Sequence, residues 1–386
     1  MTRPPADEAV LLDKARAGDQ AAFSELVARY ETGIRLHCYR MLGSFHDAED
    51  VTQEVLVRAW RHLGSFDGRS SLHTWLYRIA TNRCLTSRAR RVPEAPAGAA
   101  FAPPPPNAPE AEVADLQPFP DAYLGGLVPQ EPGAVYDLRE SVSLAFLTVI
   151  QLLPARQRAV LLLRDVLGFS AAETAQQLEM TVAGVNSALQ RARAALEPHR
   201  ASGRIPGKPR PAGDESERRL IGRYVAAWHA NDVPALLSLL REDALLTMPP
   251  FPAAYGGRHA IGKFLRSVPA GGRLDQITLV PARANLQPAV AAYIGDNDGG
   301  GCSAYGIMVL TVDGDHIIEI TGFADPALFK AFCLPGRLEG RRGLRRKPRR
   351  PGPRDHRRHR RRGQRAQDVR RTGVHAERPH VHRHCR

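Results

Sequence analysis

A proline-rich stretch predicts that the chain is divided into parts that fold separately. Eleven of the forty-five residues from 92 to 136 are proline, including the run Pro103–Pro106. Proline lacks a backbone N–H and restricts φ, so this segment cannot continue the helical patterns on either side. A second polar segment with proline and glycine covers residues 198–216. We expect the first segment to be a spacer without chemistry, and the 386 residues to form two or three domains.

The positive charge of the chain is concentrated at its C-terminal end. Residues 337–386 contain 20 Lys and Arg against 4 Asp and Glu, whereas residues 1–336 contain 34 against 36. The first 336 residues are therefore nearly neutral, and their basic side chains must act by clustering. Residues 336–386 lack apolar periodicity and are expected to be a disordered tail. Two interpretations of this tail stay open: a basic arm that binds nucleic acid without specificity, and the product of a shifted reading frame.

Cysteine usage and hydropathy restrict the class of protein. The five cysteines are scattered, without a C-x-x-C motif or a metal-ligand spacing. This pattern favours reduced thiols and indicates neither a metal site nor a disulfide framework. The most apolar stretch, Leu144–Leu153, is too short to span a bilayer. We therefore expect a cytoplasmic protein with no cofactor, no metal and no membrane partner.

Residues 8–91 read as consecutive helices, and the stretch 47–60 is strongly amphipathic. At 3.6 residues per turn, one side of this stretch carries apolar residues: Ala48, Val51, Val55, Leu56 and Ala59. A separate acidic stripe carries Asp47, Asp50 and Glu54, with Gln53 beside it. An isolated acidic stripe is more often a solvated helix face than a binding site. The segment that follows this stripe favours a binding site.

That following segment, residues 70–91, interleaves aromatic and basic side chains on a helix. The side chains suited to stacking with bases and to pairing with phosphates are Trp75, Arg78, Asn82, Arg83, Arg88, Arg90 and Arg91. Trp75 could also be partly structural, and Asn82 could simply form a local hydrogen bond. We favour contact of Asn82 with an unstacked base, because base edges carry sequence information whereas the arginines mostly contact phosphate.

The two segments in this order resemble the second conserved region of bacterial sigma factors of the extracytoplasmic-function group. The resemblance implies that the acidic helix docks on RNA polymerase through Asp47, Asp50, Gln53 and Glu54. It also implies that the helix with Trp75 and Asn82 captures the melted promoter element nearest the start site. The partners would then be the bacterial RNA polymerase core enzyme and promoter DNA.

Helical periodicity returns over residues 137–197 and predicts a helix-turn-helix. We expect one helix over Tyr136–Ile150 and another that restarts at Pro154. Gly168-Phe169 then forms a break, and Ser170 and Glu173 have the spacing of a capping box. A tight turn at Glu179-Met180 leads to a helix capped by Thr181, with Val182, Val185 and Leu189 facing inward.

The N-terminal residues of such a second helix contact base edges. The side chains that we expect to reach DNA are Thr181, Ala183, Gly184, Asn186, Ser187, Gln190 and Arg191, with Arg193 also polar and within reach. The segment resembles the fourth conserved region of sigma factors, which reads the upstream promoter element. It departs from the usual pattern, because Asn186 and Ala188 stand where a Lys and an Arg are more common. That departure weakens the expected phosphate contact.

Residues 217–335 have a different character, with helices first and strands afterwards. Helices are expected over Arg219–Ala230, Val233–Leu240 and Arg258–Val268, and strands over Ala244–Met248, Ile277–Leu286 and Ala289–Gly295. A hairpin joins Ser303–Val312 to His316–Gly322 around Asp313-Gly314. This order predicts an α+β domain with an antiparallel sheet. It resembles the SnoaL-like group of the ketosteroid-isomerase-type cone, in its helix order and in the segments Met248-Pro249-Pro250 and Gly257–Ile261.

Several side chains of this cone domain could line a pocket: Trp228, His229, Asp232, Asp243, Met248, Tyr255 and Phe264. A cone enzyme needs a general base beside an apolar cavity. Asp232 and Asp243 are the candidates, but Asp232 precedes a helix and is better explained as an N-cap. We therefore expect no catalytic residue, and a domain that regulates or senses a small-molecule ligand.

Together these features predict two all-α sigma domains followed by an α+β cone and a tail. The protein would direct RNA polymerase to promoters, with the cone controlling it in cis, and would not be an enzyme. Two alternatives stay open: a one-component helix-turn-helix regulator that senses a ligand in the cone, and a cone isomerase or hydrolase fused to DNA-binding helices. The first alternative leaves residues 8–91 without a purpose.

Overall fold

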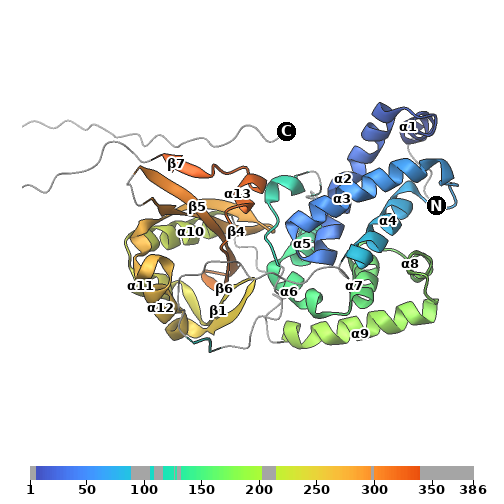
Figure 1. The fold of residues 1–386 in the computed structure, drawn as a ribbon. Helices are drawn as coiled ribbons and strands as arrows, with labels where there is room; N and C mark the ends of the chain where they lie inside the picture. The colour runs from blue at the N-terminus through green and yellow to red at the C-terminus, as the bar shows by residue number, and fades with distance from the viewer. Residues whose placement is uncertain are drawn as a thin grey trace, which may run out of the picture.

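The computed structural model describes residues 6–87, 105–107, 116–125, 127, 132–201, 214–296 and 300–339. A helical part and a part built on a curved sheet lie side by side (Figure 1). Three of the predicted DNA-binding arginines, Arg88, Arg90 and Arg91, lie outside the described residues, as do residues 340–386 of the expected tail. No helix within the described ranges is long and apolar enough to cross a membrane.

The first helical domain consists of α1 (Ala6–Arg16), α2 (Gln20–Leu42), α3 (Phe45–His62) and α4 (Leu72–Ser87). Asp19 begins α2 as an N-cap, since its carboxylate accepts hydrogen bonds from the backbone N–H groups of Ala21 and Ala22. The apolar side of α3 is buried as its periodicity predicts, with Ala48, Val51, Val55 and Ala59 at most 3% exposed. This packing leaves the acidic side of α3 outward.

The second helical domain consists of α5 (Pro132–Val142), α6 (Leu144–Leu152), α7 (Ala155–Leu161) with a π-helical turn to Val166, α8 (Ala171–Leu178) and α9 (Val182–Ala201). The single helix expected over Tyr136–Ile150 is wrong. Ser143 interrupts it, because its hydroxyl accepts a hydrogen bond from Phe146 N and begins a new helix. α9 also continues five residues beyond Leu196.

The helix-turn-helix is confirmed in its local details. Ser170 and Glu173 form the reciprocal hydrogen bonds of a capping box at the start of α8. Glu179 ends α8 in the left-handed region with φ 54°. Thr181 Oγ1 then accepts a hydrogen bond from Gly184 N at 3.0 Å and begins α9. Each of these residues was identifiable from local spacing alone.

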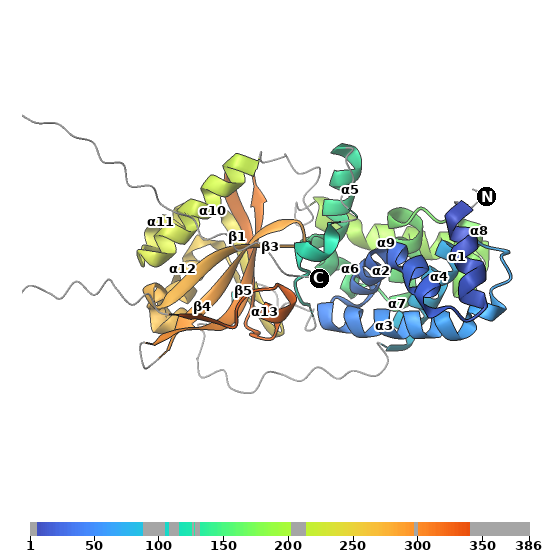
Figure 2. The same cartoon turned by 90° about the horizontal axis from the view of Figure 1, so that it is seen from above.

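The cone domain packs α10 (Asp214–His229), α11 (Val233–Ser238) and α12 (Gly257–Ser267) against one sheet (Figure 2). The strands are β1 (Leu240–Met248), β2 (Phe251–Gly256), β3 (Ile277–Ala284), β4 (Gln287–Gly295), β5 (Gly301–Asp313), β6 (His316–Phe323) and β7 (Arg337–Glu339). Their order is β2-β1-β6-β5-β4-β3, and β7 pairs with β5.

Two expectations for this sheet are wrong, and one strand was missed. β1 runs parallel to β6, so the sheet is mixed rather than antiparallel. β2 was not predicted from the sequence. β7 lies within residues 336–386, which were expected to be a disordered tail, and pairs with the start of β5. The errors at β6 and β7 concern pairings between segments far apart in the chain, which local periodicity does not reveal. β2 instead pairs with β1, its neighbour in the chain.

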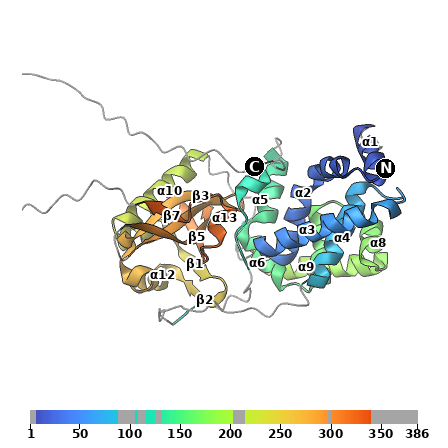
Figure 3. The same cartoon turned by 45° about the horizontal axis from the view of Figure 1, so that its top comes forward.

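The described residues form two hydrophobic cores. One lies inside the cone, between its helices and the inner face of the sheet. The other runs through both helical domains and reaches Ala291, Val309 and Phe323 of the sheet. In Figure 3, α5 and α6 lie between the sheet and the other helices of the two helical domains. The two helical domains therefore pack together in this structure instead of standing apart on a flexible tether.

The expected spacer takes part in this shared core. Leu116, Phe119 and Leu124 are at most 4% exposed. Gln117 N donates to Gly43 O at 2.9 Å, and Phe45 contacts the ring of Phe119 with centroids 5.4 Å apart. The interpretation of residues 92–136 as a spacer without chemistry is thus wrong for this portion, where aromatic and leucine side chains gain burial free energy.

Candidate nucleic-acid interface

The outward face of α4 carries the side chains predicted to capture a melted DNA strand. Arg78 and Asn82 are exposed and lie one helical turn apart. Trp75 is half-buried, and its ring packs on Phe66 with centroids 5.3 Å apart, so it is partly structural. Arg83 is half-buried and pairs with Glu54 of α3. An exposed amide beside guanidinium groups suits the edge of an unstacked base next to phosphate.

The acidic face of α3 is open to solvent beside this surface. Asp50, Gln53 and Glu54 are exposed, and Asp47 is half-buried near the N-terminus of the helix. The pair between Glu54 and Arg83 joins residues that the sequence analysis assigned to different partners. Val57, 48% exposed, extends the same face by one turn and was missed. Its i+3 spacing from Glu54 is the signal that could have identified it.

The exposed face of α9 carries most of the side chains predicted to read duplex DNA. These exposed residues are Thr181, Ala183, Asn186, Ser187, Gln190 and Arg191, and Gly184 is half-buried. Val182 is 45% exposed, so its predicted inward orientation is wrong. Ala188 is 2% exposed and belongs to the core. An alanine at this position, where an arginine is more common in the family it resembles, therefore removes no contact on the exposed face of α9 in this structure.

The helix-turn-helix covers part of α4. The ring of Phe169 stacks on His73, with centroids 5.4 Å apart and 29° between planes. Arg78 Nη2 lies 4.0 Å from Glu179 Oε1 in the turn before α9. The surface predicted to contact a melted strand and the surface predicted to contact duplex DNA thus touch each other. His73 is half-buried beside Phe169, whereas Arg78 stays exposed.

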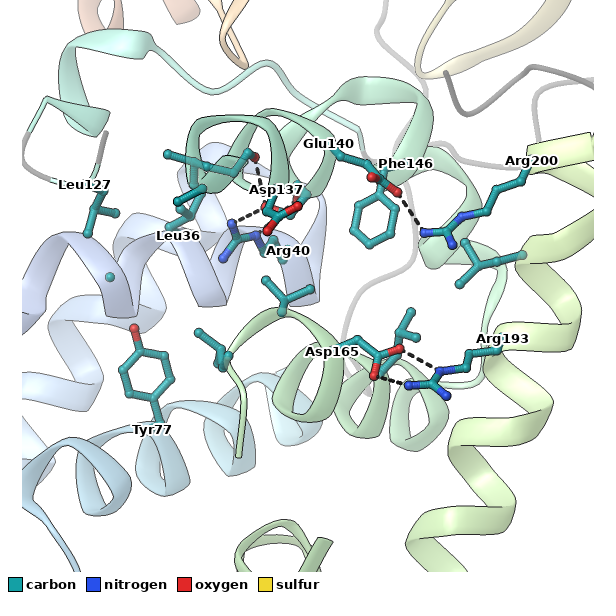
Figure 4. Close-up of a pocket in the computed structure, with 18 of the residues that line it drawn as sticks. Leu36, Arg40, Tyr77, Leu127, Asp137, Glu140, Phe146, Asp165, Arg193 and Arg200 are labelled. Carbon is teal, nitrogen blue, oxygen red and sulfur yellow. Dashed lines mark hydrogen bonds and ion pairs between the residues drawn. The ribbon is translucent and has the colours of Figure 1, made fainter. Parts of the chain in front are cut away.

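A groove of about 530 Å³ is lined by residues of both helical domains (Figure 4). Arg193 of α9 binds Asp165 at 2.7 Å, and Arg200 binds Glu140 of α5 at 2.7 Å. Arg40, only 4% exposed, lies in the groove and donates to Ser141 O at 3.1 Å and Ser141 Oγ at 2.6 Å. Burial lowers the pKa of Arg40 to about 10.

A second buried arginine fastens the two helical domains together. Arg158 is 1% exposed and donates to Met41 O of α2 at 2.6 Å. It also donates to the carbonyl oxygens of Ile150 and Leu153 at 2.8 and 3.0 Å. A buried guanidinium is stable only when its donors are used in this way. Arg158 therefore holds the end of α2 against α6 and α7.

The turn between β3 and β4 enters the junction between the two helical domains. Asn285 and Leu286 both have positive φ, 58° and 55°, as in the tight turns that twist with a hairpin. The Asn285 side chain is 0% exposed. Its Oδ1 accepts from Phe119 N at 2.8 Å, and its Nδ2 donates to Tyr39 Oη at 2.8 Å and to Val142 O at 2.7 Å.

Asn285 thereby binds α2, the proline-rich segment and the end of α5 at once. We call the turn residues Ala284–Gln287 the β3–β4 tip. Neighbouring contacts strengthen its attachment: Leu286 N donates to Asp121 Oδ1 at 2.7 Å, and Leu144 N donates to Gln287 Oε1 at 3.1 Å. Arg283 also pairs with Asp121 at 3.1 Å. No motif in the sequence marks this site.

We expect His37 to make the first helical domain sensitive to acid. It is 0% exposed, and its Nε2 lies 2.8 Å from Thr81 Oγ1. Burial, with Arg40 and His73 nearby, lowers the pKa of His37 from 6.5 to about 3. The neutral ring is therefore favoured in the fold. Stability from this group is present above pH 6.5 and is lost as the pH falls from about 6.5 toward 3.

We expect His37→Gln to flatten this acid dependence. Between pH 6 and 4, the free energy of unfolding of the wild type should fall more steeply than that of the variant, by up to about 1.4 kcal/mol per pH unit. Urea denaturation at several pH values measures both slopes, and carboxylate titration cancels in their difference. Equal slopes would show that His37 is not held neutral by burial.

The carboxylates considered for catalysis in the cone have structural explanations. Asp232 caps α11, since its Oδ1 accepts from Ala235 N at 2.9 Å, as predicted. Asp243 is exposed on β1 and pairs with Arg241. Among the described residues, no group of three or more His, Cys, Asp and Glu could hold a metal ion.

Three segments match known protein families. Residues 26–92 match Sigma-70 region 2, and residues 143–196 match Sigma-70, region 4. Residues 221–320 match the SnoaL-like domain. These segments lie on α2–α4, on α6–α9 and on the cone, so each match covers one structural part.

One reported relative is similar over most of the chain, and another over about half of it. The chain is 39% identical over 342 residues to the ECF RNA polymerase sigma factor SigG of Mycobacterium tuberculosis, and 87% of each chain is covered. It is 31% identical to the ECF RNA polymerase sigma factor SigW of Bacillus subtilis, over 48% of this chain and 92% of SigW. The crystal structure of the Mycobacterium tuberculosis extracytoplasmic function sigma factor SigJ aligns with a TM-score of 0.52 and 22% identity, over 81% of this chain and 99% of that chain. This last match concerns the fold alone.

Proposed function

Because the chain belongs to the extracytoplasmic-function sigma factors, which direct bacterial RNA polymerase to specific promoters, we propose that its cone domain controls this activity in cis. The cone would do so by contact rather than by catalysis. It would hold the two promoter-binding domains in the packed arrangement described above. Its release would let the two domains move apart and would uncover the part of α4 that lies under Phe169.

We assign the roles of individual residues from their positions on the surfaces of α3, α4 and α9. We propose that Asp50, Gln53 and Glu54, with Asp47 beside them, bind core polymerase. Trp75, Arg78, Asn82 and Arg83 would hold the melted strand of the downstream element, with Arg88, Arg90 and Arg91 continuing toward phosphate. The upstream element would be read by Thr181, Ala183, Gly184, Asn186, Ser187, Gln190 and Arg191. Exposure of most of these side chains supports the assignment.

Asn82→Ala tests strand capture most cleanly. Asn82 is exposed, whereas Trp75 packs on Phe66, so only the first substitution should leave the fold unperturbed. We expect open-complex formation to fall by about tenfold, since a hydrogen-bonded base contact contributes about 1–3 kcal/mol of discrimination. Permanganate reactivity of the melted promoter measures it.

Thr86→Ala is the matched control for this substitution. Thr86 is exposed one turn further along α4, and its hydroxyl donates to the backbone oxygen of Asn82 at 2.7 Å. It should therefore leave open-complex formation unchanged. If Asn82→Ala behaved like this control, the assignment of Asn82 to an unstacked base would be wrong.

The observation that best supports control of transcription by the cone is the burial of the β3–β4 tip between the two helical domains. Asn285 uses both of its side-chain polar atoms there, on three separate segments. The packed arrangement in turn places Phe169 against His73 and Glu179 near Arg78. A buried, fully hydrogen-bonded amide is expensive to expose. The tip therefore stabilises a closed form in which α4 is partly covered.

Promoter-dependent transcription with core polymerase tests this proposal. A substitution at the β3–β4 tip should raise transcription, although the tip belongs to neither promoter-binding surface. Unchanged or lower transcription, with normal folding, would show that the junction does not restrain the sigma domains.

A further inference from the structure

The groove that both helical domains line has the size of a small-molecule site. Its volume of about 530 Å³ lies within the roughly 300–1,000 Å³ that such sites usually have. Apolar side chains from both domains form much of its wall, among them Leu36 of α2, Leu138 of α5, Phe146 of α6 and Leu196 of α9. A molecule with an apolar body would therefore contact both domains at once.

One side of this groove carries a buried positive charge. Arg40 is 4% exposed, and burial lowers its pKa only to about 10, so it stays charged near neutral pH. Its Nε and Nη2 donate to Ser141, but within the described ranges Arg40 forms no ion pair and its Nη1 makes no hydrogen bond. The buried Arg158, by contrast, uses Nε, Nη1 and Nη2 as donors. Buried charges are normally paired, so Arg40 is suited to bind an anion.

A buried hydroxyl lies near this charge. Tyr77 is 4% exposed and lines the same groove, and no other described residue is a hydrogen-bond partner of its Oη. Gly33 of α2 leaves room for it, because a Cβ there would lie 2.6 Å from Tyr77 Oη. In Figure 4 this hydroxyl points toward the helix that carries Arg40. Burial raises the pKa of Tyr77 to about 12, against a smaller opposing effect of Arg40, so the hydroxyl stays protonated and can donate.

The remaining charged side chains limit the occupant to a single negative charge. Two carboxylates of the groove are already paired with arginines, as the dashed lines in Figure 4 show. Asp137 and Glu197 are exposed and would repel a dianion such as a phosphate ester. Of the described cations that line the groove, only Arg40 lacks a carboxylate partner. One guanidinium and one hydroxyl match the two oxygens of one carboxylate.

We propose that this groove binds a small monocarboxylate with an apolar body, whose two oxygens accept hydrogen bonds from Arg40 Nη1 and Tyr77 Oη. The apolar body would lie against the leucine side chains and Phe146. The inference concerns binding alone. It stands or fails independently of whether the cone controls transcription.

Three probes with one phenylpropyl skeleton test the charge of the occupant. 3-Phenylpropionate carries the carboxylate, 3-phenylpropionamide replaces it with a neutral amide, and 3-phenylpropylamine carries a positive charge. Each is titrated into the full chain at pH 7 by isothermal titration calorimetry. We expect saturable binding of the propionate at one site, about tenfold or more tighter than that of the amide, since hydrogen bonds to charged groups are the stronger ones. The amine should bind most weakly.

Tyr77→Phe tests the hydroxyl with little disturbance of the fold. It should weaken binding of the propionate about three- to tenfold, which corresponds to one hydrogen bond. Tyr293→Phe is the matched control and should leave this affinity unchanged. The hydroxyl of Tyr293 is also buried without a partner in the described structure, but Tyr293 belongs to the cone and does not line the groove.

Arg40→Gln tests the charge, and its amide can still donate to Ser141 O. We expect the ratio of the propionate and amide affinities to fall to about one, and this ratio is insensitive to general loosening because both probes share one skeleton. Arg200→Gln is the control, because it removes the same charge from another residue of the groove and should preserve the ratio.

Several outcomes would overturn the proposal. Absence of saturation by the propionate, or equal affinities of the propionate and the amide for the wild type, would exclude a carboxylate site. Equal effects of Tyr77→Phe and Tyr293→Phe would exclude the hydroxyl. Equal effects of Arg40→Gln and Arg200→Gln would exclude Arg40 as the anion ligand. If Arg40→Gln did not fold, the three probes and Tyr77→Phe would still decide.

Discussion

Asp50→Arg is expected to weaken binding to core polymerase by about a hundredfold or more. Asp50 is exposed at the centre of the acidic face of α3, and its charge faces solvent in the free protein. Reversal would place like charges together in the complex, which costs several kcal/mol, and about 1.4 kcal/mol corresponds to each tenfold loss. Co-purification and equilibrium titration with core polymerase measure this affinity.

The choice of Asp50 over Glu54 follows from the structure. Glu54 pairs with Arg83, so its reversal would also disturb the surface for the melted strand. Glu25→Arg is the control, because Glu25 is exposed on α2 and the charge change is the same. Equal affinities of Asp50→Arg and Glu25→Arg would contradict the assignment of α3 to polymerase.

Asn285→Gly is expected to raise promoter-dependent transcription by about tenfold or more. Glycine accepts the positive φ of this position, so the substitution removes the side chain without straining the turn. The loss leaves Phe119 N and Val142 O without their partner in the junction. Unpaired groups of this kind cost about 1–3 kcal/mol each, enough to shift a closed-to-open equilibrium by ten- to a hundredfold.

Asn231→Gly separates this effect from general loosening of the cone. Asn231 also has a positive φ, 55°, and among the described residues its side chain accepts from Leu274 N of the cone, at 3.2 Å. It should leave transcription unchanged. Run-off transcription at limiting sigma factor compares both variants with the wild type. If Asn285→Gly did not exceed Asn231→Gly, the β3–β4 tip would not restrain the sigma domains.

Local signals predicted the local structure well. The capping box at Ser170 and Glu173, the cap at Thr181 and the apolar face of α3 each depend on residues close in sequence. Amphipathic periodicity is a property of a single helix, so the burial of Val51 and Val55 could be predicted from the sequence. The interruption at Ser143 was not, since a serine inside a continuous apolar pattern gives only a weak signal.

Contacts between distant segments could not be predicted. Asn285 appears in the sequence as an ordinary turn residue, yet it contacts Tyr39, Phe119 and Val142. Those partners lie 143 to 246 positions away in the chain. For the same reason the parallel pairing of β1 with β6 and the burial of Phe119 were missed. The proline content correctly indicated that the helices are interrupted. It did not indicate that the apolar residues between the prolines would be buried.

The distance between α4 and α9 tests most directly whether the packed arrangement is the inactive form of the protein. Fluorophores introduced at Thr86 and Ala194, both exposed, report this distance by energy transfer without using the native cysteines. We predict a short distance in the free protein and a clearly longer one in the complex with core polymerase and promoter DNA. The same short distance in the transcribing complex would contradict the account, because the packed arrangement would then be the active one.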